Sequence, residues 1–148
     1  MSRFSWLTLL FIALSIVACD NDLAPSQVPS IVKNTFKYRF SKAMDVEWEY
    51  IKNAYEVNFE VNNVDHEALL DSSGNLQKYK YAIDKNRLPK NLQSFLQHKY
   101  PNRKWEDPEH VIEGSFDYYQ LELDSFLNDK KLVVDSLGKV LPDIKYWD

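Results

Sequence analysis

The sequence predicts an α+β fold made of two tandem helix-plus-antiparallel-strand repeats, which form one sheet with two helices packed on one face. Three observations predict this arrangement: a helical stripe that occurs twice, alternating apolar residues after each stripe, and two turn sequences of the same form. A helix and a sheet each have an apolar face that must be buried, so the two layers should share one core.

The helical stripe recurs at a constant offset of 60 residues. Its apolar positions in the two copies are Val28, Val32, Phe36, Phe40 and Leu88, Leu92, Leu96, Tyr100. A spacing of four places each set along one side of a helix. Pro29 and Pro89 fall near the first turn, where a missing N–H is harmless, so we expect a helix to begin at each.

Strands are predicted where aromatic and β-branched residues alternate with polar ones. This alternation covers residues 46–50, 55–61, 79–83 and 119–123. The block at 55–59 recurs at 119–123, at an offset of 64 residues. We expect these strands to pair into one antiparallel sheet.

Two turns follow the strand blocks at the same offset of 64, at residues 71–74 and 135–138. In each, an Asp opens the turn and a Gly takes a positive φ, so both should be hairpins.

The rise in offset from 60 to 64 requires four extra residues between Tyr100 and Tyr119. Insertions usually fall in loops, so we expect a long loop over residues 101–117.

The N-terminus has the form of a targeting segment. Arg3 is the only charge before residue 20, and the apolar run from Trp6 to Val17 is too short to span a bilayer. The run ends Ile-Val-Ala-Cys, and this small residue before Cys19 resembles the lipobox of bacterial lipoproteins. The alternatives are a plain secretion signal with a free Cys19 and an N-terminal anchor that is kept.

The lipobox resemblance implies cleavage before Cys19 and a lipid on its sulfur. The polar stretch that follows has the composition of a short tether. The expected organisation is a lipoprotein signal peptide at 1–18, the lipidated Cys19 and tether at 19–27, and a domain at 28–148 made of repeats 28–87 and 88–148.

The composition excludes several function classes. Lys and Arg number 18 against 22 Asp and Glu, and the net charge of −4 disfavours nucleic-acid binding. One cysteine cannot build a disulfide framework or a zinc site. Three glycines leave no room for a Gly-rich phosphate loop, so no cofactor is expected.

No catalytic or metal motif emerges from the candidate residues. His66-Glu67 begins like a zinc-protease helix, but Leu70 occupies the position of the second His. The turns at Asp71 and Asp135 offer too few oxygen ligands for calcium. No serine lies in a nucleophile-elbow sequence.

The candidate binding face consists of polar residues that alternate with the apolar strand residues: Glu56, Asn58, Glu60, Gln120 and Glu122. They should lie on the side of the sheet opposite the apolar residues. Two interpretations stay open: a solvated sheet face, or an acidic surface that binds a basic partner or peptide.

Lys78-Tyr79-Lys80-Tyr81 alternates basic and aromatic residues. Such interleaving can stack on nucleobases, but the net negative charge favours core or edge tyrosines, with lysines that protect an edge strand. The remaining unassigned aromatics, for which burial is favoured over an interface role, are Trp105, Tyr118, Tyr146 and Trp147.

Several of these features together resemble PepSY-like domains. They are the lipobox, the helix opened by Val-Pro or Leu-Pro, the Trp48 strand, Tyr-x-Val-x-Phe at 55–59 and Leu-Leu-Asp-x-x-Gly at 69–74. More closely, residues 28–142 are similar to the β-lactamase-inhibitor-like, PepSY-like lipoproteins of Gram-negative envelopes. The resemblance implies a secreted or membrane-anchored domain that binds or inhibits a protein, and it supplies no functional residue. The inhibitors of β-lactamases are disulfide-bonded and this chain is not, which argues against β-lactamase inhibition itself.

The expected function is therefore that of a membrane-anchored, non-enzymatic envelope lipoprotein, on the periplasmic side or at the cell surface. It would bind an unknown protein or peptide, in the manner of an inhibitor, through the open sheet face or the 101–117 loop. The alternative is a structural or accessory lipoprotein of another envelope system, and an enzyme ranks third.

Overall fold

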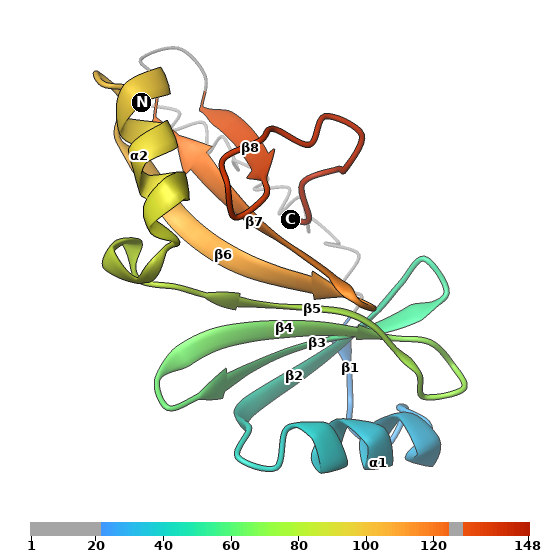
Figure 1. Cartoon of the computed structure of the whole chain (residues 1–148). Helices are drawn as coiled ribbons and strands as arrows, with labels where there is room; N and C mark the ends of the chain where they lie inside the picture. The colour runs from blue at the N-terminus through green and yellow to red at the C-terminus, as the bar shows by residue number, and fades with distance from the viewer. Residues whose placement is uncertain (1–21, 125–128) are drawn as a thin grey trace, which may run out of the picture.

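The alternating segments form one eight-stranded antiparallel sheet in the computed structural model, which describes residues 22–124 and 129–148 (Figure 1). The strands follow one another across the sheet in chain order: β1 (Asp22–Leu23), β2 (Met44–Ile51), β3 (Ala54–Val61), β4 (Val64–Leu70), β5 (Leu76–Ala82), β6 (Trp105–Glu113), β7 (Phe116–Leu123) and β8 (Lys130–Val134). With two α-helices, the described chain has the α+β architecture that the sequence predicts.

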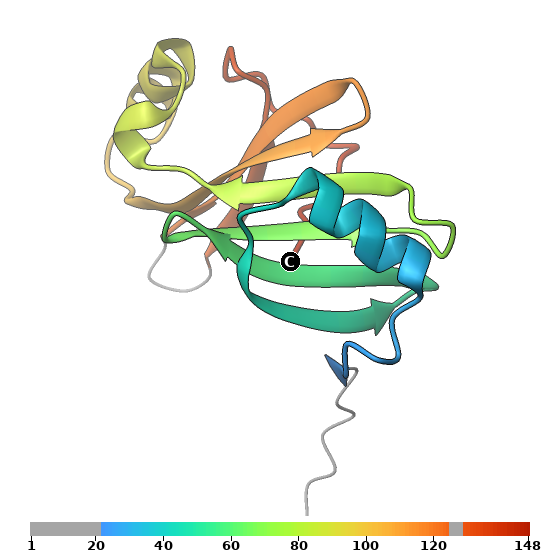
Figure 2. The same cartoon turned by 90° about the horizontal axis from the view of Figure 1, so that it is seen from below.

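The two helices are α1 (Ser30–Arg39) and α2 (Lys90–Lys99), and each begins directly after its proline. A short 3₁₀ helix, η1 (Lys85–Arg87), precedes α2. Each helix packs on its own half of the sheet, α1 against β2–β5 and α2 against β7 and β8. Figure 2 shows α1 lying along the strands of the first half, with α2 at the far end.

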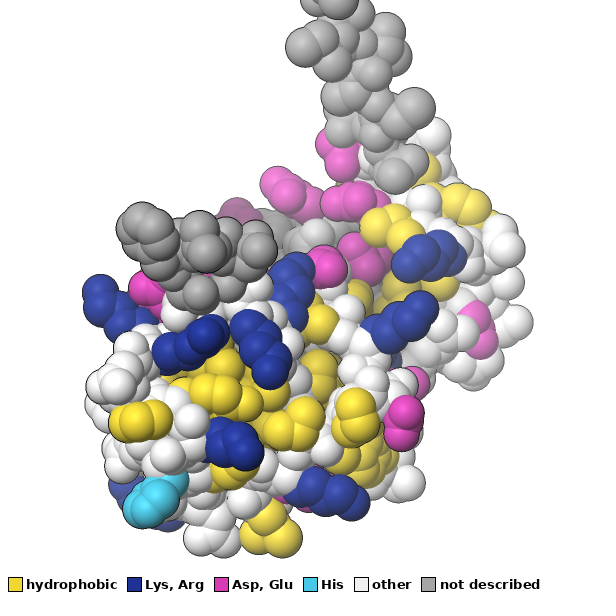
Figure 3. All heavy atoms as spheres, turned by 90° about the horizontal axis from the view of Figure 1, so that it is seen from above, with side chains coloured by type: hydrophobic (Ala, Val, Ile, Leu, Met, Phe, Trp, Pro, Cys, Tyr) yellow, Lys and Arg dark blue, Asp and Glu magenta, His cyan; other side chains and the backbone are white. Residues whose placement is uncertain are grey.

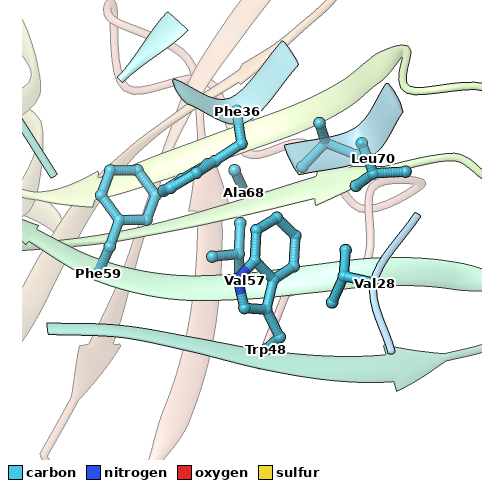
Figure 4. Close-up of a cluster of buried hydrophobic side chains, with 8 residues drawn as sticks. Val28, Phe36, Trp48, Val57, Phe59, Ala68 and Leu70 are labelled. Carbon is cyan, nitrogen blue, oxygen red and sulfur yellow. The ribbon is translucent and has the colours of Figure 1, made fainter. Parts of the chain in front are cut away.

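The core of the first half is aromatic. Phe36 on α1 meets Trp48 and Phe59 edge-on, at ring-centroid distances of 5.2 and 5.0 Å. Figure 4 shows these rings with Val57 and Ala68 between the helix and the sheet. Edge-on packing of this kind adds about 0.5–1.5 kcal/mol per pair to the area that the rings bury.

The two predicted turns have the same hydrogen bonds. Asp71 Oδ1 accepts from the amides two and four residues later, each at 2.9 Å, and Asp135 Oδ1 does the same at the same distances. The turn at Asp71 closes the β4–β5 hairpin as predicted. The turn at Asp135 leads only to a single bridge between Val134 and Val140.

The prediction of a loop over 101–117 is wrong, because β6 occupies most of that segment. Four residues separate the paired Tyr50 and Tyr55, namely 51–54, whereas eight separate the paired His110 and Tyr119, namely 111–118. The four extra residues therefore lengthen the β6–β7 hairpin by two residue pairs.

The N-terminal predictions fall largely outside the described residues. The signal peptide at 1–18 and the lipid site at Cys19 lie there. Within the predicted tether, Asp22 and Leu23 pair with Glu49 and Trp48 as strand β1. None of the helices in the described parts of the chain has the length and apolar character needed to cross a membrane.

Candidate binding face

The predicted binding residues do share one side of the sheet. Cross-strand partners point to the same side, and the register links Glu56 to Leu69 and Lys78, Asn58 to Glu67 and Lys80, and Glu109 to Gln120. We call this side, which carries Glu56, Asn58, Glu60, Glu67, Lys80, Glu109, Gln120 and Glu122, the tail face.

The second half of the tail face is covered by the last residues of the chain. The C-terminal tail, residues 141–148, folds back from β8 toward the middle of the sheet (Figure 1). Trp147 packs with Val111, Tyr118 and Val133 in a separate buried cluster. Gln120 lies beneath it with none of its surface exposed. The expectation of an open face is therefore wrong at Gln120, because the tail occupies it.

Gln120 holds the main chain of Trp147 with both ends of its amide. Its Nε2 donates to the Trp147 carbonyl at 2.7 Å, and its Oε1 accepts from the Trp147 N–H at 3.0 Å. Nε2 also donates to Glu109 Oε2 at 2.5 Å. Both polar atoms of the buried Gln120 amide are thus hydrogen-bonded, and two of its three hydrogen bonds are made with Trp147 of the tail.

Lys80 is the second buried group at this site. Its Nζ donates to the Trp147 carbonyl at 3.0 Å and lies 2.9 Å from Glu67 and 3.3 Å from Glu109. The expectation that the lysines at 78 and 80 protect an edge is wrong, because β5 lies between β4 and β6. On an inner strand, the Lys80 charge is buried and needs these two carboxylates.

The indole of Trp147 lies over both lysines of β5. Its ring centroid is 4.3 Å from Lys78 Nζ and 5.0 Å from Lys80 Nζ, and its Nε1 approaches Glu56 Oε2 at 3.4 Å. The two contacts with the lysines are cation–π interactions of a partly desolvated site, and the indole N–H donates to Glu56. The predicted burial of Trp147 and Tyr118 is confirmed.

Burial controls the titration of the groups around the tail. It raises the pKa of Glu67 to about 7, with Glu56 adding to the effect and Lys80 opposing it. Burial also lowers the pKa of Lys78, against the pull of Glu113. The charge of this network therefore depends on pH near neutrality.

The first half of the tail face stays partly open and acidic. A pocket of about 290 Å³ at the β2 end is lined by Asp45, Glu47, Asn58, Phe59, Glu60, Asp65 and His66. Glu47 and Asp65 are exposed, while Asn58 and Glu60 are half-buried. Glu122 lies elsewhere on this face, opposite Lys131, which forms an ion pair with Asp148.

Figure 3 shows acidic side chains gathered on one part of the surface, whereas Lys and Arg surround apolar side chains on the lobe that carries α2.

The opposite side of the central strands carries stacked rings rather than a ligand site. His66, Tyr79 and Tyr81 stack with centroids 5.5–5.8 Å apart, and Tyr81 Oη meets His110 Nδ1 at 2.7 Å. His110 in turn contacts Asp117 and stacks on Tyr119. In the described part of the chain, no cluster of His, Cys, Asp and Glu has the arrangement needed to hold a metal ion.

Sequence reasoning missed the tail and the buried lysine. The one available signal was composition. Most residues of the tail face are acidic, whereas Gln120 is uncharged and Lys80 is positively charged. That pattern does not indicate which segment of the chain covers these two residues.

Comparison with known proteins identifies one family. Its sequence description is "Putative beta-lactamase-inhibitor-like, PepSY-like", and it matches residues 16–78 and again 66–142, which suggests two tandem repeats. No curated protein matches the chain.

Solved structures from Bacteroides species share the fold. A "putative periplasmic" protein of Bacteroides eggerthii superposes with a TM-score of 0.73 at 13% identity, over 77% of this chain and 86% of that one. A DUF2874 family protein of Bacteroides ovatus superposes with a TM-score of 0.70 at 19% sequence identity, over 76% of this chain and 84% of that one. A BLIP-like protein of Bacteroides fragilis superposes with a TM-score of 0.68 at 17% sequence identity, over 80% of this chain and 84% of that one. Identities this low carry information on fold alone.

Proposed function

The chain belongs to the β-lactamase-inhibitor-like, PepSY-like family, and from this premise we propose that it is a non-enzymatic protein- or peptide-binding module of the cell envelope, anchored by a lipid on Cys19. An envelope location is supported by the sequence of the predicted signal peptide at 1–18, and it agrees with the "putative periplasmic" name of the Bacteroides eggerthii protein. A binding role is supported by the inhibitor-like family description. The lipid anchor is supported by the lipobox sequence before Cys19.

The partner would bind the acidic first half of the tail face. The observation that carries this proposal is the pocket beside β2, where Glu47, Glu60 and Asp65 gather without a lysine or arginine among the lining residues. A surface with one sign of charge attracts and orients a partner of the other sign. The partner we propose is a basic protein or peptide. Gln120 drops out of the proposed surface, because it is buried.

A pair of matched variants tests this surface. Immobilised mature protein carrying Cys19→Ser is used to capture partners from detergent-solubilised envelope. Glu47→Lys should weaken capture of a stoichiometric partner by about tenfold or more, whereas Asp84→Lys should not, because Asp84 is also exposed but lies outside the pocket, directly before η1. Capture should also fall as salt is raised. Equal capture by both variants contradicts the acidic surface, and failure to capture any partner favours the accessory role.

Anchoring has a separate test. Cys19→Ala should move the protein from the membrane fraction to the soluble fraction after cell breakage, because Cys19 is the one cysteine of the sequence and the variant removes the sulfur that would carry the lipid. Retention of the variant in the membrane fraction would instead indicate an uncleaved N-terminal anchor.

We propose further that both helices back one side of the sheet, which leaves the tail face for binding. The register supports this arrangement: Ala68 under α1 pairs with Tyr79, Tyr81 on the same side pairs with His110, and His110 pairs with Tyr119 under α2.

A further inference from the structure

We infer that the pocket around Gln120 and Lys80 is a peptide-binding site, occupied in cis by the C-terminal tail and able to accept a tryptophan-bearing segment of a partner protein in its place. This site is distinct from the acidic pocket beside β2. The inference goes beyond the proposed function, and the two can fail independently.

The site recognises main chain rather than a particular fold. The main chain of one tail residue, Trp147, makes three hydrogen bonds with side chains of the sheet: its carbonyl accepts from Gln120 and Lys80, and its N–H donates to Gln120. An extended peptide from another protein presents the same N–H and C=O groups. Peptides that bind sheets usually combine main-chain hydrogen bonds with side-chain pockets, and here side chains on the face of the sheet supply the hydrogen bonds.

The anchor is an indole. Trp147 packs in a buried cluster with Val111, Tyr118 and Val133, and two lysine ammonium groups lie over its ring. A tryptophan suits both surroundings, because its ring buries a large apolar area and its face attracts cations. Its Nε1 also faces Glu56 Oε2.

Within the tail, Trp147 is the one residue that is buried. Beyond the Val134–Val140 bridge, its main-chain bonds to the fold begin with Leu141 to Val133 at 2.9 Å. Pro142, Asp143 and Lys145 are exposed, whereas Leu141, Ile144 and Tyr146 are half-buried against the cluster around Trp147. A segment with few buried contacts opens before the rest of a domain.

A cavity extends from the Trp147 indole toward β3. This cavity of about 610 Å³ lies between the tail and the first half of the sheet, lined by Ile51, Lys52, Glu56, Leu69, Lys78 and the tail from Lys145 onward. A partner segment longer than the tail could extend into it.

The test uses the mature full-length chain carrying Trp147→Ala, which loosens the cis occupant and leaves Gln120 and Lys80 in place. The probe is a fluorescent octapeptide, Leu-Pro-Asp-Ile-Lys-Tyr-Trp-Asp, identical to residues 141–148. Fluorescence anisotropy should show saturable binding to the variant, and binding about tenfold or more weaker to the wild type, because the tethered tail competes at high effective concentration.

Two controls make the result specific. Adding Gln120→Leu to Trp147→Ala should reduce binding about tenfold or more, since each lost bond to the peptide unit weakens the complex. Adding the same change at Gln97, which is exposed on α2, should not reduce it. A probe with Ala in place of Trp should not bind. A folded Trp147→Ala chain that does not bind the probe, or that binds it equally with Gln120→Leu, overturns the proposal.

A second measurement covers the case in which Trp147→Ala does not fold. In the wild type, the Trp147 amide should exchange its hydrogen about a hundredfold or more faster than the amides of β7, through local opening of the tail. Equal exchange rates would make the tail part of the core and overturn the proposal. Concentration-dependent dimers in sedimentation, abolished by Trp147→Ala, would also overturn it, since they assign the site to the tail of a second copy.

Discussion

Gly138 shows how a single missing side chain lets a turn pack against a helix. Its φ is +89°, and a Cβ added there would lie 2.5 Å from both Cβ and Cγ of Phe95 on α2. Gly138→Ala should therefore destabilise the protein by about 2–4 kcal/mol, through left-handed backbone strain and overpacking together. Urea unfolding monitored by circular dichroism measures the change.

Gly114 provides the matched comparison for that substitution. Its φ is also positive, at +63°, but nothing lies within 4 Å of an added Cβ. Gly114→Ala should cost only the backbone strain, about 1 kcal/mol. If the two variants lose equal stability, the contact with Phe95 is not what requires glycine at 138.

Glu67 should make stability depend on pH. Its pKa rises from 4.5 to about 7 on folding, so between these values the folded state holds a proton that the unfolded state has lost. Stability should fall as the pH rises through this window and be level above it. Glu67→Gln keeps the side chain neutral, so the stability of this variant relative to the wild type should rise by about 1–3 kcal/mol between pH 4.5 and pH 7. Urea unfolding at intervals from pH 4 to pH 9 would show this, and parallel curves would contradict it.

Strand β6 shows why one element escaped prediction. Its first half reads Trp-Glu-Asp-Pro-Glu, with acids and a proline where a strand normally has β-branched residues. The structure accommodates them with a register irregularity between Glu106 and Glu109, and Asp107 takes a positive φ of 44°. A bulge accepts proline because its N–H is not needed in the ladder. The pattern was therefore typical of a loop, although pairing with β5 and β7 makes it a strand.

Helix α1 should owe its stability to the buried side of its stripe. Phe36 is 4% exposed and contacts two aromatic rings of the sheet, whereas Tyr38 on the same helix is 88% exposed. Phe36→Ala should cost about 3–5 kcal/mol, and Tyr38→Ala should stay within about 0.5 kcal/mol. Chemical unfolding compares the two, and similar losses would mean that α1 is not docked through this face.

At the scale of the whole molecule, local patterns predicted the helices, the β4–β5 hairpin and the side of the sheet on which Glu56 and Gln120 lie. Periodicity carries that information because each element repeats its own geometry. The covering of Gln120 was not predictable in this way. It joins residues 27 positions apart through one tryptophan in an aperiodic segment, and such a contact leaves no repeat in the sequence. The binding role of the acidic pocket stays a prediction. The pocket lies on the first half of the tail face, and the C-terminal tail covers the second half.

The two halves should unfold together rather than as separate repeats. Each has its own buried cluster, but β5 and β6 join the halves through five cross-strand pairs from Lys78–Glu113 to Ala82–Glu109. Trp147 adds a second link, since its indole reaches Glu56 on β3 while its main chain is held by Gln120 on β7. Domains in which contacts cross every boundary unfold in one step.

Scanning calorimetry of the mature chain should therefore give one transition, with equal calorimetric and van't Hoff enthalpies and about 0.7 kcal/mol per residue near 60 °C. Hydrogen exchange offers an independent readout: the amides of Val57 in the first core and Leu121 in the second should be protected to the same free energy. Two transitions, or a core that exchanges well before the other, would mean that the β5–β6 pairing and the tail do not couple the repeats, and that each repeat is stable without its partner.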